Sequence, residues 1–267
     1  MIYPSTASGQ CNLGTDFHSV SERLSYDVYF NWKFVWLKAA NADMKTQSTT
    51  YKGDGAYRTS LTGKTSGVVD GLYHVCDTLI SIVSSSDLSP LFYSKAAHEG
   101  KSYNAYEEAV YNYSGYPTVK ARLKNWRDKN LKSDTLLTSQ KCFYDPVSLL
   151  YFMRSLNYEN MPVNGYVTIP VVFTDESFNV KVTYKKTETI EVKGEKIKAV
   201  KYSLSVNGEV FENKKESVFV WLSCDENRVP VLIETKLKVG SIKALLKNVS
   251  GCKNPCAAFP SGSKIAK

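Results

Sequence analysis

The sequence predicts an all-β protein with one or two short helices, built as an antiparallel meander that curls into an open barrel or half-barrel. Short runs of alternating polar and apolar residues follow one another along most of the chain. Brief turn sequences such as Lys193-Gly194 and Asn207-Gly208 separate these runs. The composition points the same way, because 18 tyrosines accompany frequent Thr, Val and Ser residues, which favour strands. Regular short strands joined by brief turns are typical of a meander.

We expect one β-rich domain at residues 22–249, between an irregular N-terminal segment at 1–21 and a polar tail at 250–267. Its N-terminal half covers 22–140 and its C-terminal half covers 166–249. The predicted strands are 23–31, 34–49, 55–63, 75–84, 91–99, 102–113 and 117–125 in the first half, and 166–174, 178–192, 196–206, 209–212, 216–223, 229–237 and 240–247 in the second. Residues 60–71, which are rich in Gly, and the polar residues 133–140 are expected to be connections.

The first predicted strand runs into a cluster of aromatic residues. In the stretch SYDVYFNWKFVW, the even positions from Tyr26 to Trp36 are all large and apolar, whereas the odd positions are mostly polar. This period of two predicts a strand with one buried face. Two interpretations remain open. One long bent strand places Trp32 and Trp36 on the same buried face, whereas a hairpin that turns near residues 31–33 leaves Trp32 at a rim.

One helix is predicted at 145–157. Asp145 suits the N-cap, Pro146 suits the first helical position, and apolar residues recur at helical spacing from Leu149 to Leu156. In the later segment ESVFVWLS, Phe219 and Trp221 are expected to face away from Val220 and Leu222. The helix would roof a cup of aromatic side chains, and the candidate ligand-binding residues in that cup are Trp32, Trp36, Tyr151, Phe152 and Trp221.

Catalytic and metal-binding motifs are missing from the sequence. The motif GKTS at 63–66 lacks the first glycine of a phosphate-binding loop, since Arg58 occupies that position. The chain has three His and six Cys residues without a CxxC pair, so we expect no metal site, no cofactor and no enzymatic activity.

The cysteines allow one short-loop disulfide. Cys252 and Cys256 lie in the turn sequence GCKNPC, where a bridge is geometrically possible. Cys76, Cys142 and Cys224 each have apolar neighbours, and we expect them to be buried free thiols.

A formal net charge of +8 favours anionic partners in general. The basic segment 119–132 has the composition of a site for single-stranded nucleic acid, in which the cations neutralise phosphates and Trp126 stacks on a base. Acidic residues interleave with the basic ones there and in the second basic region at 181–201, as on any solvated β-sheet, so we expect no nucleic-acid partner. No apolar run is long enough to span a bilayer, and we expect a monomer that is peripheral to a membrane at most.

Four phrases, found in this order, resemble a known bacterial family. They are ERLSYDVYFNWKFVWLKAANADM, DLSPLFYSKAAHEGKSYNAYEE, YDPVSLLYFMRSL and VFVWLSCDENRVPVLIETKLKVGSIKALL. Together they resemble domain of unknown function 3108 over about residues 22–249, in particular exported proteins of the Bacteroides group. The chain has Ala40 where the family pattern favours Gly. The resemblance implies export to the periplasm, a single β-rich domain and no established activity.

The N-terminus is compatible with export, because Ala7 and Gly9 have the spacing that a signal peptidase reads. At the level of architecture, the predicted meander with its central helix also looks like the lipoprotein-carrier (LolA/LolB-like) half-barrel, whose concave face binds acyl chains.

These features favour an exported cell-envelope protein that binds or carries a lipid, a lipoprotein acyl chain or another hydrophobic ligand in a concave sheet. The alternative is a structural or protein-interaction module of the bacterial envelope that has no small ligand and whose aromatic residues are all core.

Overall fold

The computed structural model describes residues 19–33, 35–115, 117–207, 218–237 and 240–256. In the N-terminal half the elements are β1 (Arg23–Trp32), β2 (Val35–Tyr51), β3 (Asp54–Thr65), α1 (Gly67–Leu72), β4 (Val75–Ser84), β5 (Pro90–Glu99), β6 (Tyr103–Asn112), β7 (Val119–Arg127) and β8 (Asn130–Ser139). They are followed by α2 (Pro146–Ser155), the 3₁₀ turn η1 (Tyr158–Asn160), β9 (Tyr166–Phe173), β10 (Glu176–Val192), β11 (Glu195–Asn207), β12 (Val218–Ser223), β13 (Pro230–Lys236) and β14 (Ser241–Ser250).

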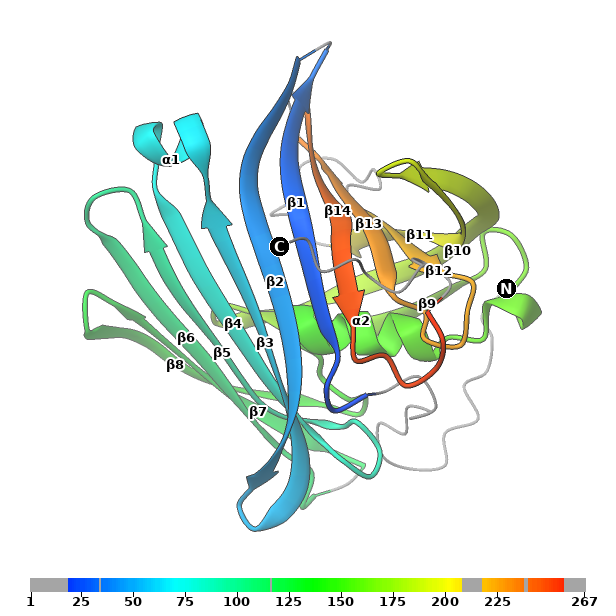
Figure 1. The fold of residues 1–267 in the computed structure, drawn as a ribbon. Coiled ribbons are helices and arrows are strands. Elements are labelled where there is room, and N and C mark those ends of the chain that lie inside the picture. The colour runs from blue at the N-terminus through cyan, green and yellow to red at the C-terminus, as the bar shows by residue number, and fades with distance from the viewer. Residues whose placement is uncertain (1–18, 34, 116, 208–217, 238–239, 257–267) are drawn as a thin grey trace.

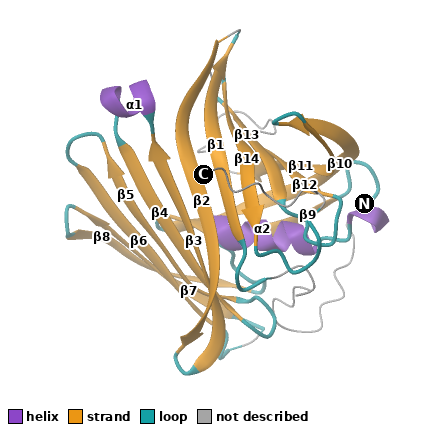
Figure 2. Ribbon diagram, viewed as in Figure 1, coloured by secondary structure: helices purple, strands orange, loops and turns teal. Residues whose placement is uncertain are grey.

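The 14 strands of the described residues belong to one sheet, in the order β8-β7-β6-β5-β4-β3-β2-β1-β14-β13-β12-β11-β10-β9. Every strand pair in this sheet is antiparallel. The sheet curls around α2 and its two edge strands are not paired with each other (Figures 1 and 2). The predicted fold class, an all-β antiparallel meander curled into an open barrel, is confirmed.

The first and last strands lie side by side in the middle of the sheet. Arg23 at the start of β1 pairs with Ser250 at the end of β14, and the pairing continues to Asn31 and Ser241. Every other strand pairs only with its neighbours in sequence. The two free edges therefore belong to β8 and β9, which are consecutive strands in the sequence and are joined through α2.

Two predictions of local structure were wrong. Residues 133–140 are not a connection, because β8 covers 130–139 and pairs with β7 through a turn in which Asp128 and Lys129 both have positive φ. Such a turn usually contains Gly or Asn-Gly, and neither is present to signal it. The Gly-rich segment 60–71 is likewise not a connection, since β3 extends to Thr65 and α1 follows. The predicted strand 209–212 lies outside the described residues.

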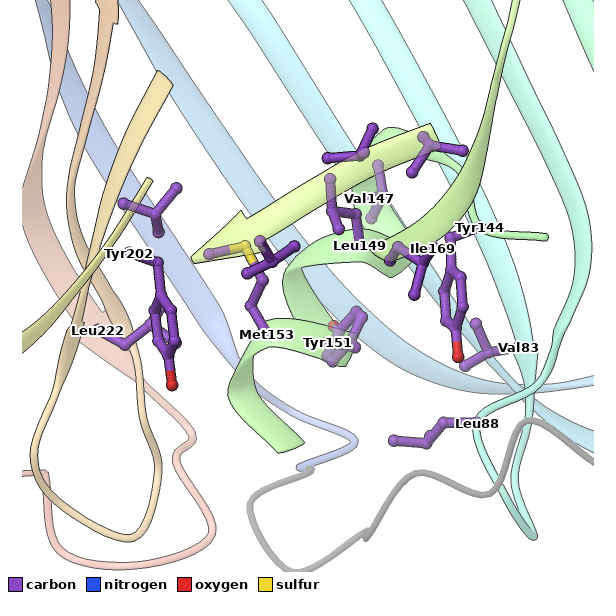
Figure 3. Close-up of a cluster of buried hydrophobic side chains, with 14 of the residues drawn as sticks. Val83, Leu88, Tyr144, Val147, Leu149, Tyr151, Met153, Ile169, Tyr202 and Leu222 are labelled. Carbon is purple, nitrogen blue, oxygen red and sulfur yellow. The ribbon is translucent and has the colours of Figure 1, made fainter. Parts of the chain in front are cut away.

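Helix α2 begins and ends as predicted to within two residues and fills the lower part of the concave face. Asp145 caps it, accepting hydrogen bonds from the backbone N–H groups of Val147 (3.0 Å) and Ser148 (2.9 Å). The buried apolar side chains of α2 pack against residues of both halves of the sheet. Figure 3 shows part of this cluster, in which Val147, Leu149, Tyr151 and Met153 of α2 lie among Val83, Leu88, Tyr144, Ile169, Tyr202 and Leu222.

The C-terminal end of α2 is fixed by a buried ion pair. The guanidinium group of Arg154 donates to both carboxylate oxygens of Glu22 (2.7 and 2.8 Å) and to the backbone carbonyl of Asn227 (2.7 and 3.1 Å). The side chains of Arg154 and Glu22 are at most 2% exposed. Because one partner precedes β1 and another follows β12, this contact ties α2 to both halves of the sheet.

The long hairpin β10–β11 folds back over the outer, convex face of the sheet. At its turn, Lys193 forms an ion pair with the buried Asp27 of β1. Further along the hairpin, Glu188 accepts a hydrogen bond of 2.9 Å from the indole N–H of Trp221. Although burial raises the pKa of Asp27, hydrogen bonds from Lys193 and Lys38 hold it below its usual value. None of the described helices is long and apolar enough to cross a membrane.

Candidate functional site

Above α2, small side chains leave the concave face of the sheet hollow. Ala42 of β2 pairs with Gly63 of β3, which in turn pairs with Asp77 of β4. One row nearer the β1–β2 turn, Ala40 pairs with Val28 of β1. Directly paired residues on neighbouring strands point to the same face of a sheet. These five residues therefore form a continuous floor, and all of them line one pocket.

The space above this floor is unfilled. A Cβ atom added at Gly63 would meet no heavy atom within 4 Å. In the next row toward α2, Met44, Leu61 and Leu79 are paired in the same way, and there the larger side chains belong to the packed core. The pocket therefore begins where the side chains of β2 and β3 become small.

The walls of the pocket are apolar and come from four strands and α1. They enclose a volume of about 520 Å³, which is within the range of small-ligand sites. The apolar wall residues are Phe30, Leu37, Val69, Val75 and Ile242.

A β-bulge places α1 beside this pocket. In the β1–β2 pair, Val28 is opposite Ala40 and Tyr29 is opposite Lys38, so Ala39 has no partner in β1. The carbonyl of Ala39 instead accepts a hydrogen bond of 3.0 Å from the N–H of Ser66, the residue just before α1. The bulge thus fixes one wall of the pocket as well as the bend of β2.

Polar groups lie along one edge of the pocket. The carboxylate of Asp77 is 3.5 Å from the ammonium group of Lys95 and accepts a hydrogen bond from the N–H of His98 (3.3 Å). Thr65, which pairs with Ala40, also lines the pocket on the same face. The arrangement suits an amphipathic ligand whose apolar part occupies the hollow and whose polar end reaches this edge.

A buried carboxylate at the N-terminus of α2 stabilises the fold. The carboxylate of Asp145 accepts hydrogen bonds from the hydroxyls of Ser81 (2.9 Å) and Ser148 (2.8 Å) in addition to its helix-capping contacts. Burial raises the pKa of Asp145 to about 6, against the opposing effect of these hydrogen bonds.

The structure places the predicted site residues of α2 outside the pocket. Tyr151 is 1% exposed, and its hydroxyl is 2.7 Å from the hydroxyl of Thr46 and 2.8 Å from that of Thr59. Phe152 packs against the ring of Tyr144, with the ring centres 5.1 Å apart. Both side chains anchor α2 to its surroundings rather than line the hollow.

Trp36 is not buried, and the prediction that it belongs to a core or a pocket wall was wrong. Phe30 and Leu37 are paired and line the pocket, so the neighbouring Trp36, opposite Asn31, points to the outer face. There it is 53% exposed, stacks edge-on against Tyr29 and lies 5.0 Å from the ammonium group of Lys243. The bulge at Ala39 is the cause, because it shifts the alternation of β2 by one residue.

Trp221 does not complete a cup of aromatic side chains around the pocket. Trp221 is 5% exposed and lies under the β10–β11 hairpin on the outer face, beside Phe219. Phe219 and Trp221 do face away from Val220 and Leu222, as predicted, because the two pairs belong to different core clusters. Of the two interpretations of the first aromatic stretch, the hairpin is correct, since Trp32 pairs with Val35 across the turn. The side chain of Trp32 lies outside the described residues.

None of the described residues that line the pocket was among the candidates, and the small residues of its floor carried the available signal. The segment KAANAD and the isolated Gly63 within a strand were the available signals, because a glycine inside a strand often marks a close approach or an open space. Their meaning depends on the pairing of Ala42 with Gly63, which no local pattern reveals.

The described cysteines differ in state. Cys142 is disulfide-bonded, so the expectation of a free thiol was wrong there. Cys76 and Cys224 are free and partly buried. No disulfide joins Cys252 to Cys256 in the structure, and a hydrogen bond between the two side chains, followed by burial, raises the pKa of Cys252. No group of three or more His, Cys, Asp or Glu side chains within the described ranges is arranged to hold a metal ion.

Comparison with known proteins identifies the family. The sequence matches the family described as "Protein of unknown function (DUF3108)" over residues 25–247. The chain belongs to the DUF3108 family. The fold of this DUF3108 chain is similar to a crystal structure described as a β-barrel-like protein of domain of unknown function DUF1849 from Brucella abortus, with a TM-score of 0.54 and 10% sequence identity. The similarity covers 87% of this chain and 98% of that one.

A search of curated proteins found no match to the DUF3108 chain. The structural similarity to the DUF1849 protein extends to the fold and no further. The likeness to lipoprotein carriers stays a prediction.

Proposed function

We propose that this chain is a cell-envelope protein without catalytic activity that binds an acyl chain or a similar hydrophobic ligand in the pocket above α2. The supporting observation is the pocket of about 520 Å³, with a floor of small side chains and walls of Phe30, Leu37, Val69, Val75 and Ile242. Transfer of an apolar chain from water to such a surface is favourable by roughly 25 cal/mol for each Å² buried.

Export is part of the same proposal. The family resemblance supports it, and so does the disulfide at Cys142, because disulfides persist mainly in oxidising compartments such as the periplasm. Fractionation of native cells, with periplasmic and cytoplasmic marker proteins, tests this location. Recovery of the folded protein from the cytoplasm alone would contradict it.

A binding experiment with two variants on one strand tests the ligand site. Gly63→Phe places a ring in the pocket where no atom lies within 4 Å of the new Cβ. Ser60→Phe is the matched control, because Ser60 lies on the same strand but faces outward, opposite Lys45 and Ile80. Titration of a fluorescent long-chain fatty acid should show binding to the wild type and to Ser60→Phe, and loss of binding for Gly63→Phe.

Two results would count against the ligand site. If the wild type binds no fatty acid at micromolar concentration, the acyl-binding proposal fails. If Gly63→Phe binds as well as the wild type while both remain folded by circular dichroism, the ligand occupies another place.

The alternative, an interaction module, also has an observation in its favour. Edge strand β8 has no partner on its outer side in the sheet order, and its Leu131 and Leu136 are exposed. An unpaired edge with apolar side chains is a common site for strand addition by a partner. This function would be favoured if the wild type takes up no ligand and Leu131→Lys abolishes capture of a partner from the envelope fraction.

A further inference from the structure

Exposed apolar side chains gather around the mouth of the pocket. Of the 15 large apolar side chains that are exposed within the described ranges, six lie at the start of β2, on α1 or at the start of β14. We call these six residues the apolar rim: Val35, Trp36, Leu37, Val68, Leu72 and Ile242.

The three segments of the apolar rim lie at one end of the molecule, the upper end in Figure 1. The pairing of the strands requires this, because Asn31 is opposite both Trp36 of β2 and Ser241 of β14. The hydrogen bond from Ser66 to Ala39 holds α1 beside β2 at the same end. Leu37 and Ile242 belong to the rim and to the pocket wall, so the two apolar surfaces are continuous.

Helix α1 is open to solvent. None of its residues is buried, and Val68 and Leu72 are 72% and 82% exposed. An exposed apolar group of this kind beside a binding pocket usually marks a surface that another apolar phase covers. Trp36, at the start of the neighbouring strand β2, is the residue type that prefers a membrane–water interface, since its ring is apolar and its N–H remains polar.

The charges around the rim are mainly positive. In the described parts of residues 31–38, 64–73 and 236–243 there is one acidic residue, Asp70. The same segments carry five lysines: Lys33, Lys38, Lys64, Lys236 and Lys243. Asp70 is engaged by Thr65 (2.6 Å) and His74 (2.7 Å). Two of the lysines are also paired, Lys38 with Asp27 (2.7 Å) and Lys243 with Glu234 (3.5 Å). Apolar tips surrounded by lysines complement a bilayer surface that contains anionic lipid.

We infer that the apolar rim docks on an anionic lipid bilayer, with α1 and the β1–β2 turn entering the head-group region. In that orientation the pocket opens toward the hydrocarbon, and an acyl ligand passes between bilayer and pocket without crossing water. The passage of a ligand rests on the proposed function, whereas the docking itself does not.

Vesicle sedimentation with the full chain tests the docking. Vesicles of phosphatidylcholine with phosphatidylglycerol are compared with vesicles of phosphatidylcholine alone, using the wild type, Val68→Ser/Leu72→Ser and Leu131→Ser/Leu136→Ser. The last variant is the matched control, because it removes two exposed apolar side chains from β8. We expect the wild type to bind the anionic vesicles more tightly, and the α1 variant to bind at least about tenfold more weakly, since two apolar side chains no longer enter the interface.

The lysines are tested separately. Lys33→Gln/Lys64→Gln should weaken binding to anionic vesicles by about fivefold for each lysine, and should make it less sensitive to salt. The β8 control should bind like the wild type.

The outcomes separate docking from ligand binding. Val68→Ser/Leu72→Ser should still bind fluorescent fatty acid in the absence of vesicles, and Gly63→Phe should still bind vesicles. Docking is overturned if the wild type does not bind anionic vesicles. It is equally overturned if the β8 variant no longer binds these vesicles while the α1 variant still does. A third result would also overturn docking. If sedimentation velocity shows that the wild type and the β8 variant are dimers and that Val68→Ser/Leu72→Ser is a monomer, the apolar rim contacts a second copy of the chain and not a bilayer.

Discussion

One unpaired alanine decides where Trp36 lies. With a regular β2, Trp36 would share the inner face with Ala40 and Ala42, as the alternation of the sequence suggests. The bulge at Ala39 reverses this, and Leu37 occupies the inner face instead. The face of an aromatic residue therefore follows from the pairing of the strands and cannot be read from its own strand alone.

The position of Trp36 leads to a stability prediction. Trp36→Ala should cost less than about 1.5 kcal/mol of unfolding free energy, because half of its surface is already in water. The control is Trp221→Ala, which removes the same side chain from a buried site and should cost about 3–5 kcal/mol. Urea denaturation measures both. Equal losses for the two variants would mean that Trp36 is buried in solution.

Asp145 should make the protein less stable as the pH rises. Burial raises its pKa in the folded chain to about 6, above the usual value near 4 that it regains on unfolding. A raised pKa means that the folded state binds the proton more tightly, so this residue's contribution is fully present below about pH 4 and is lost as pH rises through 6. The difference is about 3 kcal/mol at most.

Asp145→Asn isolates this effect, because asparagine also caps helices but does not titrate. The variant's unfolding free energy, relative to wild type, should rise between pH 4 and pH 8. Asp145→Ala, which loses the cap, should be destabilised by about 1–2 kcal/mol or more. A wild type and an Asp145→Asn variant with parallel pH profiles would show that Asp145 has an ordinary pKa.

At the scale of elements, α2 is the one long helix of the described chain and it is fixed at both ends. Asp145 joins its N-terminus to Ser81 of β4, and Arg154 joins its C-terminus to Glu22 and Asn227. The hydroxyl of Tyr151 contacts β2 and β3 in between. A helix held in this way acts as a rigid base for the pocket above it.

Breaking the buried ion pair should be severe. Arg154→Met leaves the Glu22 carboxylate without its partner in a site where both side chains are almost fully buried, and should cost about 3–5 kcal/mol. The double variant Glu22→Leu/Arg154→Met should recover part of this loss, because no unpaired charge remains. A double-mutant cycle by chemical denaturation measures the coupling, and a double variant no more stable than Arg154→Met alone would contradict it.

Most elements could be predicted from the sequence, and those that were missed have a common physical reason. The strands with alternating apolar residues and the helix with its Asp145-Pro146 start have signals within their own residues. Edge strand β8 has one face exposed along its length and a turn at Asp128-Lys129 without glycine, so its signal is weak. Helix α1 buries no residue, so it has no apolar stripe that could reveal it.

The site was harder to predict than the elements because it exists only in the assembled sheet. Its floor depends on pairings such as Ala42 with Gly63, and its walls come from strands that are more than 200 residues apart in the chain, Phe30 and Ile242 among them. The sequence prediction relied on large aromatic residues, whereas the floor of the pocket is formed by small residues, which leave space above them.

For the molecule as a whole, the pairing of β1 with β14 makes the strand order a permuted meander. Joining residue 267 to residue 1 and opening the chain between Ser139 and Gln140 would place β9–β14 before β1–β8, so that every described strand would pair only with its sequence neighbours. We expect this permutant to fold to the same sheet. The loop that closes the β1–β14 pair would shorten from more than 200 residues to about 40, which lowers its entropic cost by about 1.5 kcal/mol.

Stopped-flow refolding tests this, and the permutant should refold up to about tenfold faster, provided that the β1–β14 pair forms in the transition state. A permutant that fails to fold would show that the 139–140 connection is needed to close the sheet. Equal refolding rates would show that the pair forms late.

The β1–β14 pair also determines which end of the molecule faces a surface to which the chain is attached. Arg23 and Ser250 leave the sheet side by side. Phe30 at the pocket lies seven residues further along β1, about 23 Å away. A group attached at Arg23 or Ser250 would therefore lie at the opposite end of β1 and β14 from the mouth of the pocket, and would leave the mouth open to the medium.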